Sequence, residues 1–152
     1  MQGVATRILK ALQAKGELSL YSALRLARSR HGNHIDQYPL ALLIEEGYVG
    51  ITINHTPPES AETMREFSLA TTLHMFGLPK DERGQRHYLR TTSSGSIDPQ
   101  NERVFLKAKG ALYLDERRQK FRDRIYSFLI GFLGGVLAAV LSAWLRGHFR
   151  LP

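Results

Sequence analysis

The 152-residue sequence contains no cysteine. Disulfide bonds and metal sites built on thiolates are therefore excluded. The chain also lacks the GxSxG, GxxxxGK[ST] and HExxH patterns that mark hydrolases, phosphate-binding loops and zinc enzymes. SSGS at residues 93–96 has no flanking strand and helix of the kind that a phosphate loop needs. The six histidines follow no metal-ligand spacing. We expect a protein that is not an enzyme and that holds no metal or cofactor.

Charge is missing from one long stretch near the C-terminus. Residues 125–145, IYSFLIGFLGGVLAAVLSAWL, are 21 residues without Asp, Glu, Lys, Arg or Pro. A helix of this length spans about 31 Å, close to the hydrocarbon thickness of a bilayer, about 30 Å. Tyr126 and Trp144 lie near its two ends, where aromatic rings favour the headgroup level. The sequence predicts one transmembrane helix at 125–145, preceded by a basic juxtamembrane helix at 115–124 and followed by a short tail at 146–152.

Basic residues flank this stretch unequally. The chain has a formal charge of +7, and residues 115–152 alone contribute seven Lys/Arg and three Asp/Glu. The positive-inside rule places the more basic flank, and with it residues 1–114, in the cytoplasm. We therefore expect a tail-anchored protein of the inner (cytoplasmic) membrane. The residues expected to contact anionic lipid are Arg117, Arg118, Lys120, Arg122 and Arg124.

Small residues recur every four positions along the predicted span. They are Ser127, Gly131, Gly135, Ala139 and Ala143. Small side chains let helix backbones approach in a membrane, and Gly131 to Gly135 forms a GxxxG motif. The pattern predicts that the membrane helix self-associates and that the protein is a homo-oligomer.

Residues 1–114 carry alternating signals for short helices and strands. Ser19 is suited to cap a helix, as is Asp36, and Pro39 then falls in a first helical turn. Gly110 is expected to turn the chain after the last strand. The periodicity predicts helices at 4–14, 20–31, 36–46 and 59–76 and strands at 48–53 and 103–108. Residues 80–102 form a polar segment, in which 88–92 is a further candidate strand. A last helix is expected from 111 into the membrane.

Two stretches resemble the winged-helix (winged helix-turn-helix) domains of bacterial proteins. LALLIEEGYV at 40–49 is similar to the third helix and the turn into the wing. VFLKAKGALYLDERR at 104–118 is similar to the strand, Lys-Gly turn and helix that close many such domains. The resemblance covers roughly 4–54 and 103–120, and 55–102 departs from it as an insertion. It implies an α+β, winged-helix-like domain at 1–114. Small proteins of this kind with a C-terminal membrane helix resemble effectors of bacterial defence or regulatory modules.

The predicted third helix is unusual for a DNA reader, because residues 33–47 contain no Lys or Arg. Arginine and lysine supply most phosphate contacts and many base contacts. We therefore expect the domain to bind a protein partner, with nucleic acid as a disfavoured ligand. The alternative is a membrane-tethered DNA-binding transcriptional regulator. The candidate contact residues for either ligand are Arg25, Arg28, Arg30, Gln37, Tyr38, Arg86 and Arg90.

Overall fold

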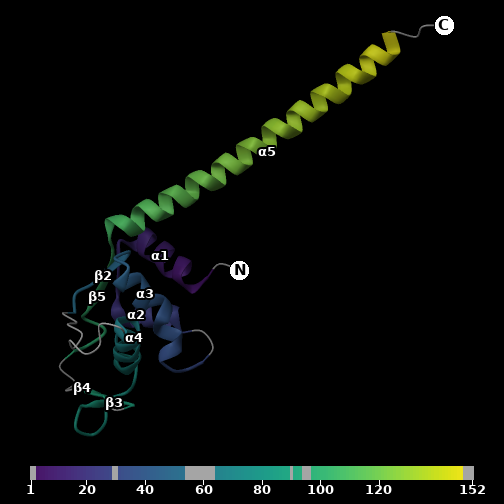
Figure 1. The fold of residues 1–152 in the computed structure, drawn as a ribbon. Helices are drawn as coiled ribbons and strands as arrows, with labels where there is room; N and C mark the ends of the chain where they lie inside the picture. Colours follow the sequence, from purple (N-terminus) through teal and green to yellow (C-terminus); the bar gives the residue numbers. More distant parts are fainter. Residues whose placement is uncertain (1–2, 29–30, 54–63, 90, 94–96, 149–152) are drawn as a thin grey trace. The chain divides into compact units, whose positions relative to one another are not determined.

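A computed structural model describes residues 3–28, 31–53, 64–89, 91–93 and 97–148. The chain divides into two units, residues 1–114 and 115–152, which are described separately below. In chain order the elements are α1 (Val4–Lys15), β1 (Glu17–Ser19), α2 (Leu20–Ala27), the 3-10 helix η1 (His34–Gln37), α3 (Tyr38–Glu45), β2 (Val49–Ile51), α4 (Arg65–Phe76), β3 (Arg86–Tyr88), β4 (Thr91–Ser93), β5 (Arg103–Leu106) and α5 (Ala108–His148) (Figure 1).

Local signals set the first two helices. Gly16 ends α1 with a φ of +79°, a backbone conformation that glycine adopts readily, and its N–H donates to the Leu12 carbonyl. The Ser19 hydroxyl accepts the Ser22 N–H at 3.3 Å and caps α2, which confirms the predicted cap. Helix α2 ends at Ala27, earlier than the predicted 31, because the Arg28 backbone leaves the helical region at ψ 119°.

The three-stranded sheet is antiparallel, with the order β1-β5-β2. The last strand of unit 1 thus pairs on both sides with strands from the first third of the chain. Phe105 is the register partner of Glu17 on one side and of Gly50 on the other. A Cβ at residue 50 would collide with the Phe105 ring, so the absence of a side chain at Gly50 lets that ring lie across the strand.

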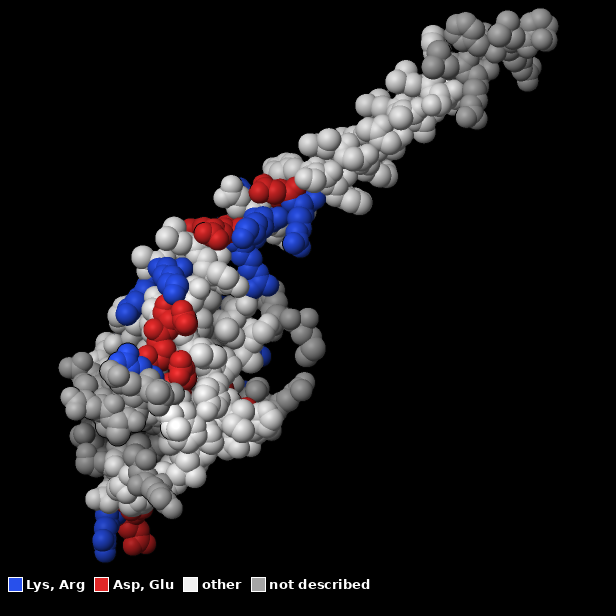
Figure 2. Space-filling model, viewed as in Figure 1, with Lys and Arg blue, Asp and Glu red and all other residues white. Residues whose placement is uncertain are grey.

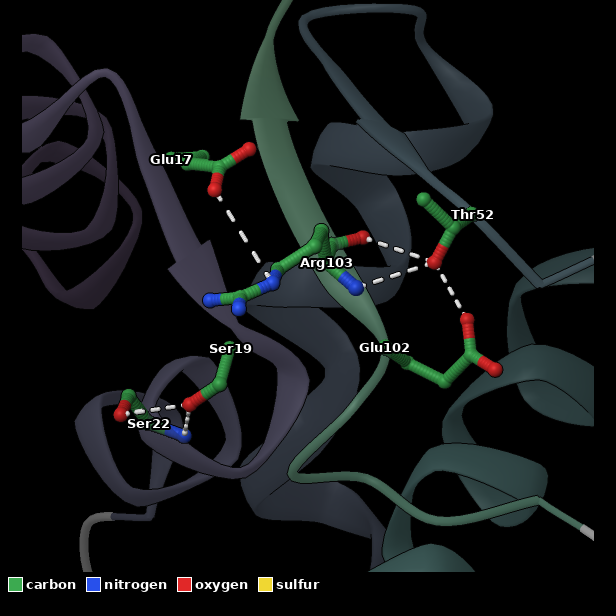
Figure 3. A network of polar contacts seen from close by, with 6 residues as sticks. All are labelled: Glu17, Ser19, Ser22, Thr52, Glu102 and Arg103. Atoms are coloured by element: carbon green, nitrogen blue, oxygen red, sulfur yellow. Dashed lines mark hydrogen bonds and ion pairs between the residues drawn. The ribbon is translucent and has the colours of Figure 1, made fainter.

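Polar side chains join the ends of these strands (Figure 3). The Thr52 hydroxyl donates to the Glu102 carboxylate and accepts the Arg103 N–H at 2.9 Å. The Thr52 N–H donates to the Arg103 carbonyl at 3.0 Å, and Arg103 Nε lies 3.9 Å from Glu17 Oε1. The Thr52 contacts extend the pairing of β5 with β2 by one residue beyond the ladder, and the Arg103–Glu17 pair lies within the ladder of β5 with β1.

The core of unit 1 lies between the helices and the sheet. Helices α1, α2, α3 and α4 and strands β1, β2 and β5 all contribute to it. The largest fully buried side chains are Ile8, Leu9, Leu12, Leu20, Leu40, Val49, Leu69, Leu73 and Val104. Burying side chains of this size typically contributes about 1.5–3 kcal/mol each, which makes this cluster the main stabilising feature of the unit.

The predicted third helix is divided in two. Residues 34–37 form η1, and α3 begins only at Tyr38, with Gln37 at its N-cap and Pro39 in its first turn. Asp36 therefore does not cap α3, contrary to the prediction. Its carboxylate is buried and accepts the backbone N–H groups of His31 and Gly32 instead, at 2.8 to 3.2 Å.

The segment predicted as an insertion contains α4 and the β3–β4 hairpin within its described residues. Helix α4 begins at Arg65, and the part of the predicted helix from 59 to 63 lies outside the described residues. The hairpin pairs His87 with Thr92 and lies away from the three-stranded sheet (Figure 1). The sequence predicted one candidate strand at 88–92, whereas the structure has two strands there, β3 ending at Tyr88 and β4 beginning at Thr91.

Gly110 does not turn the chain. It lies in the first turn of α5, where an added Cβ would meet the Tyr48 carbonyl oxygen and would come within 2.7 Å of Leu106 Cδ1. The glycine is needed for this close packing of α5 against the start of β2. The expected α+β class, with one long apolar C-terminal helix, is confirmed.

Candidate functional site

Helix α5 is long and apolar enough to cross a membrane. Every side chain from Asp115 to Trp144 is exposed. Lys and Arg alternate with acidic residues before the apolar stretch, and the apolar stretch itself is uninterrupted white on the face shown in Figure 2. An exposed surface of this kind is stable in contact with lipid tails rather than with water.

The predicted small-residue row lies entirely within this helix. An added Cβ at Gly131 or Gly135 would meet no atom within 4 Å, so these glycines leave open space along the helix. Phe128 and Phe132 stack with ring centroids 6.5 Å apart. Self-association through the row remains a prediction.

The predicted lipid-contact residues occupy the turns of α5 that precede the apolar stretch. All five side chains, those of Arg117, Arg118, Lys120, Arg122 and Arg124, are exposed. Lys120 Nζ lies 4.0 Å from Glu116, one turn earlier. An exposed pair at this distance contributes little stability, so the lysine can still face a lipid headgroup.

Three of the seven predicted contact residues line one cavity in unit 1. Arg25, Arg28 and Gln37 lie around a space of about 420 Å³ between α2, η1 and the end of α4. Both arginines are exposed at its edge, and the Arg25 guanidinium lies 6.0 Å from the centroid of the Tyr21 ring. Leu24 and Leu78 contribute apolar surface to the same cavity.

Gln37 and Asp36 place buried polar groups at this cavity. The Gln37 side chain is 5% exposed, and its Oε1 has no hydrogen-bond partner among the described residues. Asp36 is also buried, and backbone N–H groups from the preceding turn surround its carboxylate. The cavity thus combines two guanidinium groups with one carboxylate.

His74 extends the cavity toward an aromatic cluster. Its ring lies 4.4 Å from that of Tyr88, and the Tyr88 hydroxyl lies 2.9 Å from His34 Nδ1. Burial lowers the pKa of His74, and His34 and Arg28 lower it further, against an opposing effect of Asp36. His74 is therefore mainly neutral at pH 7. Sequence reasoning missed this cluster, because His34 and Tyr88 are 54 residues apart.

The other predicted contact residues lie elsewhere. Tyr38 packs beside His34, with ring centroids 6.0 Å apart. Arg86 was expected on the surface of a loop, but it is 7% exposed in β3. Its guanidinium donates to the Leu78 and Ile97 carbonyls, each at 3.0 Å. It thus holds the hairpin to its flanking segments. Arg30 and Arg90 lie outside the described residues.

The hairpin carries a second polar arrangement. His87 Nε2 lies 3.0 Å from Asp81 Oδ2, and His87 Nδ1 lies 3.1 Å from Thr92 Oγ1. The pKa of Asp81 is lowered, first by the backbone N–H of Gln85 and then by His87. The His87 side chain is 54% exposed, so water competes for every member of this group. His87 thus links the two strands of the hairpin and joins them to the preceding turn at Asp81.

Among the residues that the structure describes, no group of three or more His, Cys, Asp or Glu could hold a metal ion. Comparison with protein-family models, curated proteins and solved structures finds no match for this chain.

Proposed function

We propose that this protein is a single-pass membrane protein that presents a winged-helix-like binding domain on the cytoplasmic side of the inner membrane. The observation that carries the proposal is the exposed, uncharged stretch of α5. The basic flank that precedes this stretch supports the cytoplasmic placement of residues 1–114.

The winged-helix assignment is supported by the order of elements in unit 1. In chain order, unit 1 has α1, β1, α2, η1, α3 and β2. Strand β5 then returns and pairs between β1 and β2. In winged-helix domains the connection between the last two strands forms the wing. Here that connection includes α4 and the β3–β4 hairpin, which is consistent with an enlarged insertion at this position.

A protein partner is favoured by the surface of η1 and α3. Ile35 and Leu42 are large apolar residues that are 44% and 46% exposed. The charged residues at the end of α3 are acidic, namely Glu45 and Glu46. Leu42 also borders an apolar groove, of about 380 Å³, between α3 and the start of α1. Residues 33–47 contain no Lys or Arg for phosphate contacts, whereas a protein partner can bury the apolar residues of this surface.

Topology tests the proposal most directly. Protease added to sealed inverted membrane vesicles should digest residues 1–114 and spare the span, while intact spheroplasts should protect the domain. The opposite pattern would reverse the orientation, and recovery of the intact chain in the soluble fraction would refute membrane anchoring.

Self-association is tested within the span. Gly135→Ile places a branched side chain in the middle of the small-residue row and should strongly reduce crosslinking of the full chain in lipid. Val140→Ile adds one methylene at a position outside this row and is the matched control. Equal crosslinking of both variants and the parent would show that the row does not mediate assembly.

The alternative, a membrane-tethered DNA-binding regulator, is supported by exposed cations of unit 1, among them Arg25, Arg28, Lys107 and Lys109. It predicts a duplex complex that survives physiological salt and competitor DNA and is lost in Gln37→Ala. We expect only weak, salt-sensitive binding without sequence preference.

A further inference from the structure

The cavity between α2, η1 and α4 has the size and lining of a small-molecule site. Its volume of about 420 Å³ falls within the range of typical ligand pockets, about 300–1,000 Å³. Such pockets combine apolar walls with a few polar groups that fix the orientation of the ligand. Leu24 and Leu78 supply apolar wall here, and Arg25, Arg28 and Gln37 supply the polar groups.

The charge of the cavity favours an anion. Two arginines stand at its edge against one carboxylate, that of Asp36. Backbone N–H groups of His31 and Gly32 already donate to both Asp36 oxygens, so this carboxylate is partly neutralised by local hydrogen bonds. Guanidinium groups present a planar fork of N–H donors that matches a phosphate better than an ammonium does.

Gln37 is a further polar residue of the lining. Its Oε1 is buried and has no hydrogen-bond partner among the described residues. Because this oxygen is inaccessible from the cavity, it sets no requirement on a ligand, and other atoms of Gln37 line the space.

Tyr21 supplies a flat surface on the same cavity. Its ring is 43% exposed, and Arg25 lies against it. Aromatic rings and guanidinium planes both stack on nucleobases. A phosphate for the arginines and a ring for Tyr21 are features that a nucleotide combines in one molecule.

We propose that the cavity lined by Arg25, Arg28, Gln37 and Tyr21 binds a small phosphorylated ring compound of the nucleotide class. The site lies wholly within unit 1 and does not depend on membrane anchoring. Ligand binding there would occupy the space between α2 and α4.

The test uses the full chain in detergent micelles, titrated calorimetrically with the four 5′-ribonucleoside monophosphates. Separate titrations use free nucleosides and inorganic phosphate. We expect at least one monophosphate to bind with a sub-millimolar dissociation constant, and its nucleoside and inorganic phosphate to bind at least about tenfold more weakly, because each lacks part of the contact set. In proton NMR, the same titration should shift the imidazole resonances of His74 and leave those of His87 in place.

Three variants locate the site. Arg25→Gln and Arg28→Gln should each weaken binding about tenfold or more, as expected for loss of a charge-assisted hydrogen bond. Tyr21→Leu removes the exposed ring, so it should weaken binding of the monophosphate about tenfold and leave binding of inorganic phosphate unchanged. Lys15→Gln removes one positive charge at the end of α1, away from the cavity lining, and should leave binding unchanged.

Several outcomes would overturn the proposal. One is the absence of binding by all four monophosphates at millimolar concentration. A second is equal binding by inorganic phosphate, which would indicate a simple anion site. A third is binding that Arg25→Gln and Arg28→Gln leave unchanged, because the ligand would then lie elsewhere.

Discussion

Gly110→Ala should destabilise unit 1, although it replaces glycine within a helix. Alanine in a helix interior is favoured over glycine by about 1 kcal/mol. At this position, however, the new Cβ would meet the Tyr48 carbonyl oxygen and lie 2.7 Å from Leu106 Cδ1. The carbonyl cannot easily move, because it accepts the Lys107 N–H at 3.0 Å and the Tyr48 N–H is bonded to Leu43 at 2.9 Å.

Forcing an extra methyl group into such packing typically costs about 1–3 kcal/mol, and more where backbone must shift. The steric cost therefore exceeds the gain in helix propensity, and we expect a net loss of about 1–2 kcal/mol. For a domain of this size the melting temperature should fall by about 5–15 °C. Thermal unfolding of the full chain in detergent, followed by circular dichroism, measures the change.

Gly3→Ala is the matched control, because a Cβ at this N-cap of α1 meets nothing within 4 Å. It should change the melting temperature by no more than a few degrees. If Gly110→Ala melts with the parent or above it, the close approach of α5 to Tyr48 does not exist in the folded protein. The helix would then begin farther from β2 than the structure places it.

Two further predictions concern caps and pH. Ser19→Ala removes the hydroxyl that accepts the Ser22 N–H and should cost about 1 kcal/mol by thermal unfolding, whereas the exposed Gln13→Ala should cost little. Burial, His34 and Arg28 keep the pKa of His74 below 6.5 in the folded protein, and Asp36 opposes this shift. Its contribution to stability is therefore complete above pH 6.5, the value of the unfolded chain, and is lost as the pH falls from there through the lowered pKa of the folded state. Melting curves between about pH 7.5 and about pH 5.5 should show this loss, and His74→Gln should reduce it; identical pH profiles would contradict the assignment.

Features with a local cause could be predicted from the sequence. The end of α1 at Gly16 and the cap at Ser19 each depend on neighbours within four residues. Asp36 and Gly110 were misassigned because each residue type has two roles. Asp36 caps a turn that precedes it rather than the helix that follows it. Gly110 serves a contact with Tyr48, which is distant in sequence.

The cavity could be predicted only in part. Arg25, Arg28 and Gln37 were singled out for their chemistry, but no periodicity indicates that they surround one space with residues of α4. His74 enters that space only because α4 packs on η1 and α3, and such packing depends on the shapes of buried side chains. The buried state of Arg86 has the same origin, since its acceptors are carbonyls on two separate segments.

Helix α5 was the easiest element to predict, because an α-helix satisfies its backbone hydrogen bonds without any other segment. Its exposed apolar surface is large. Twelve large apolar side chains between residues 125 and 144 are each at least 43% exposed. At about 1.5–3 kcal/mol for each side chain, leaving them in water would forgo burial on the order of 20 kcal/mol. The unfolded chain exposes the same side chains, so this free energy is gained only when another apolar phase covers them, and it exceeds the net stability of a typical domain, about 5–15 kcal/mol. A lipid bilayer is such a phase, and the 21-residue apolar stretch of α5 is long enough to span it.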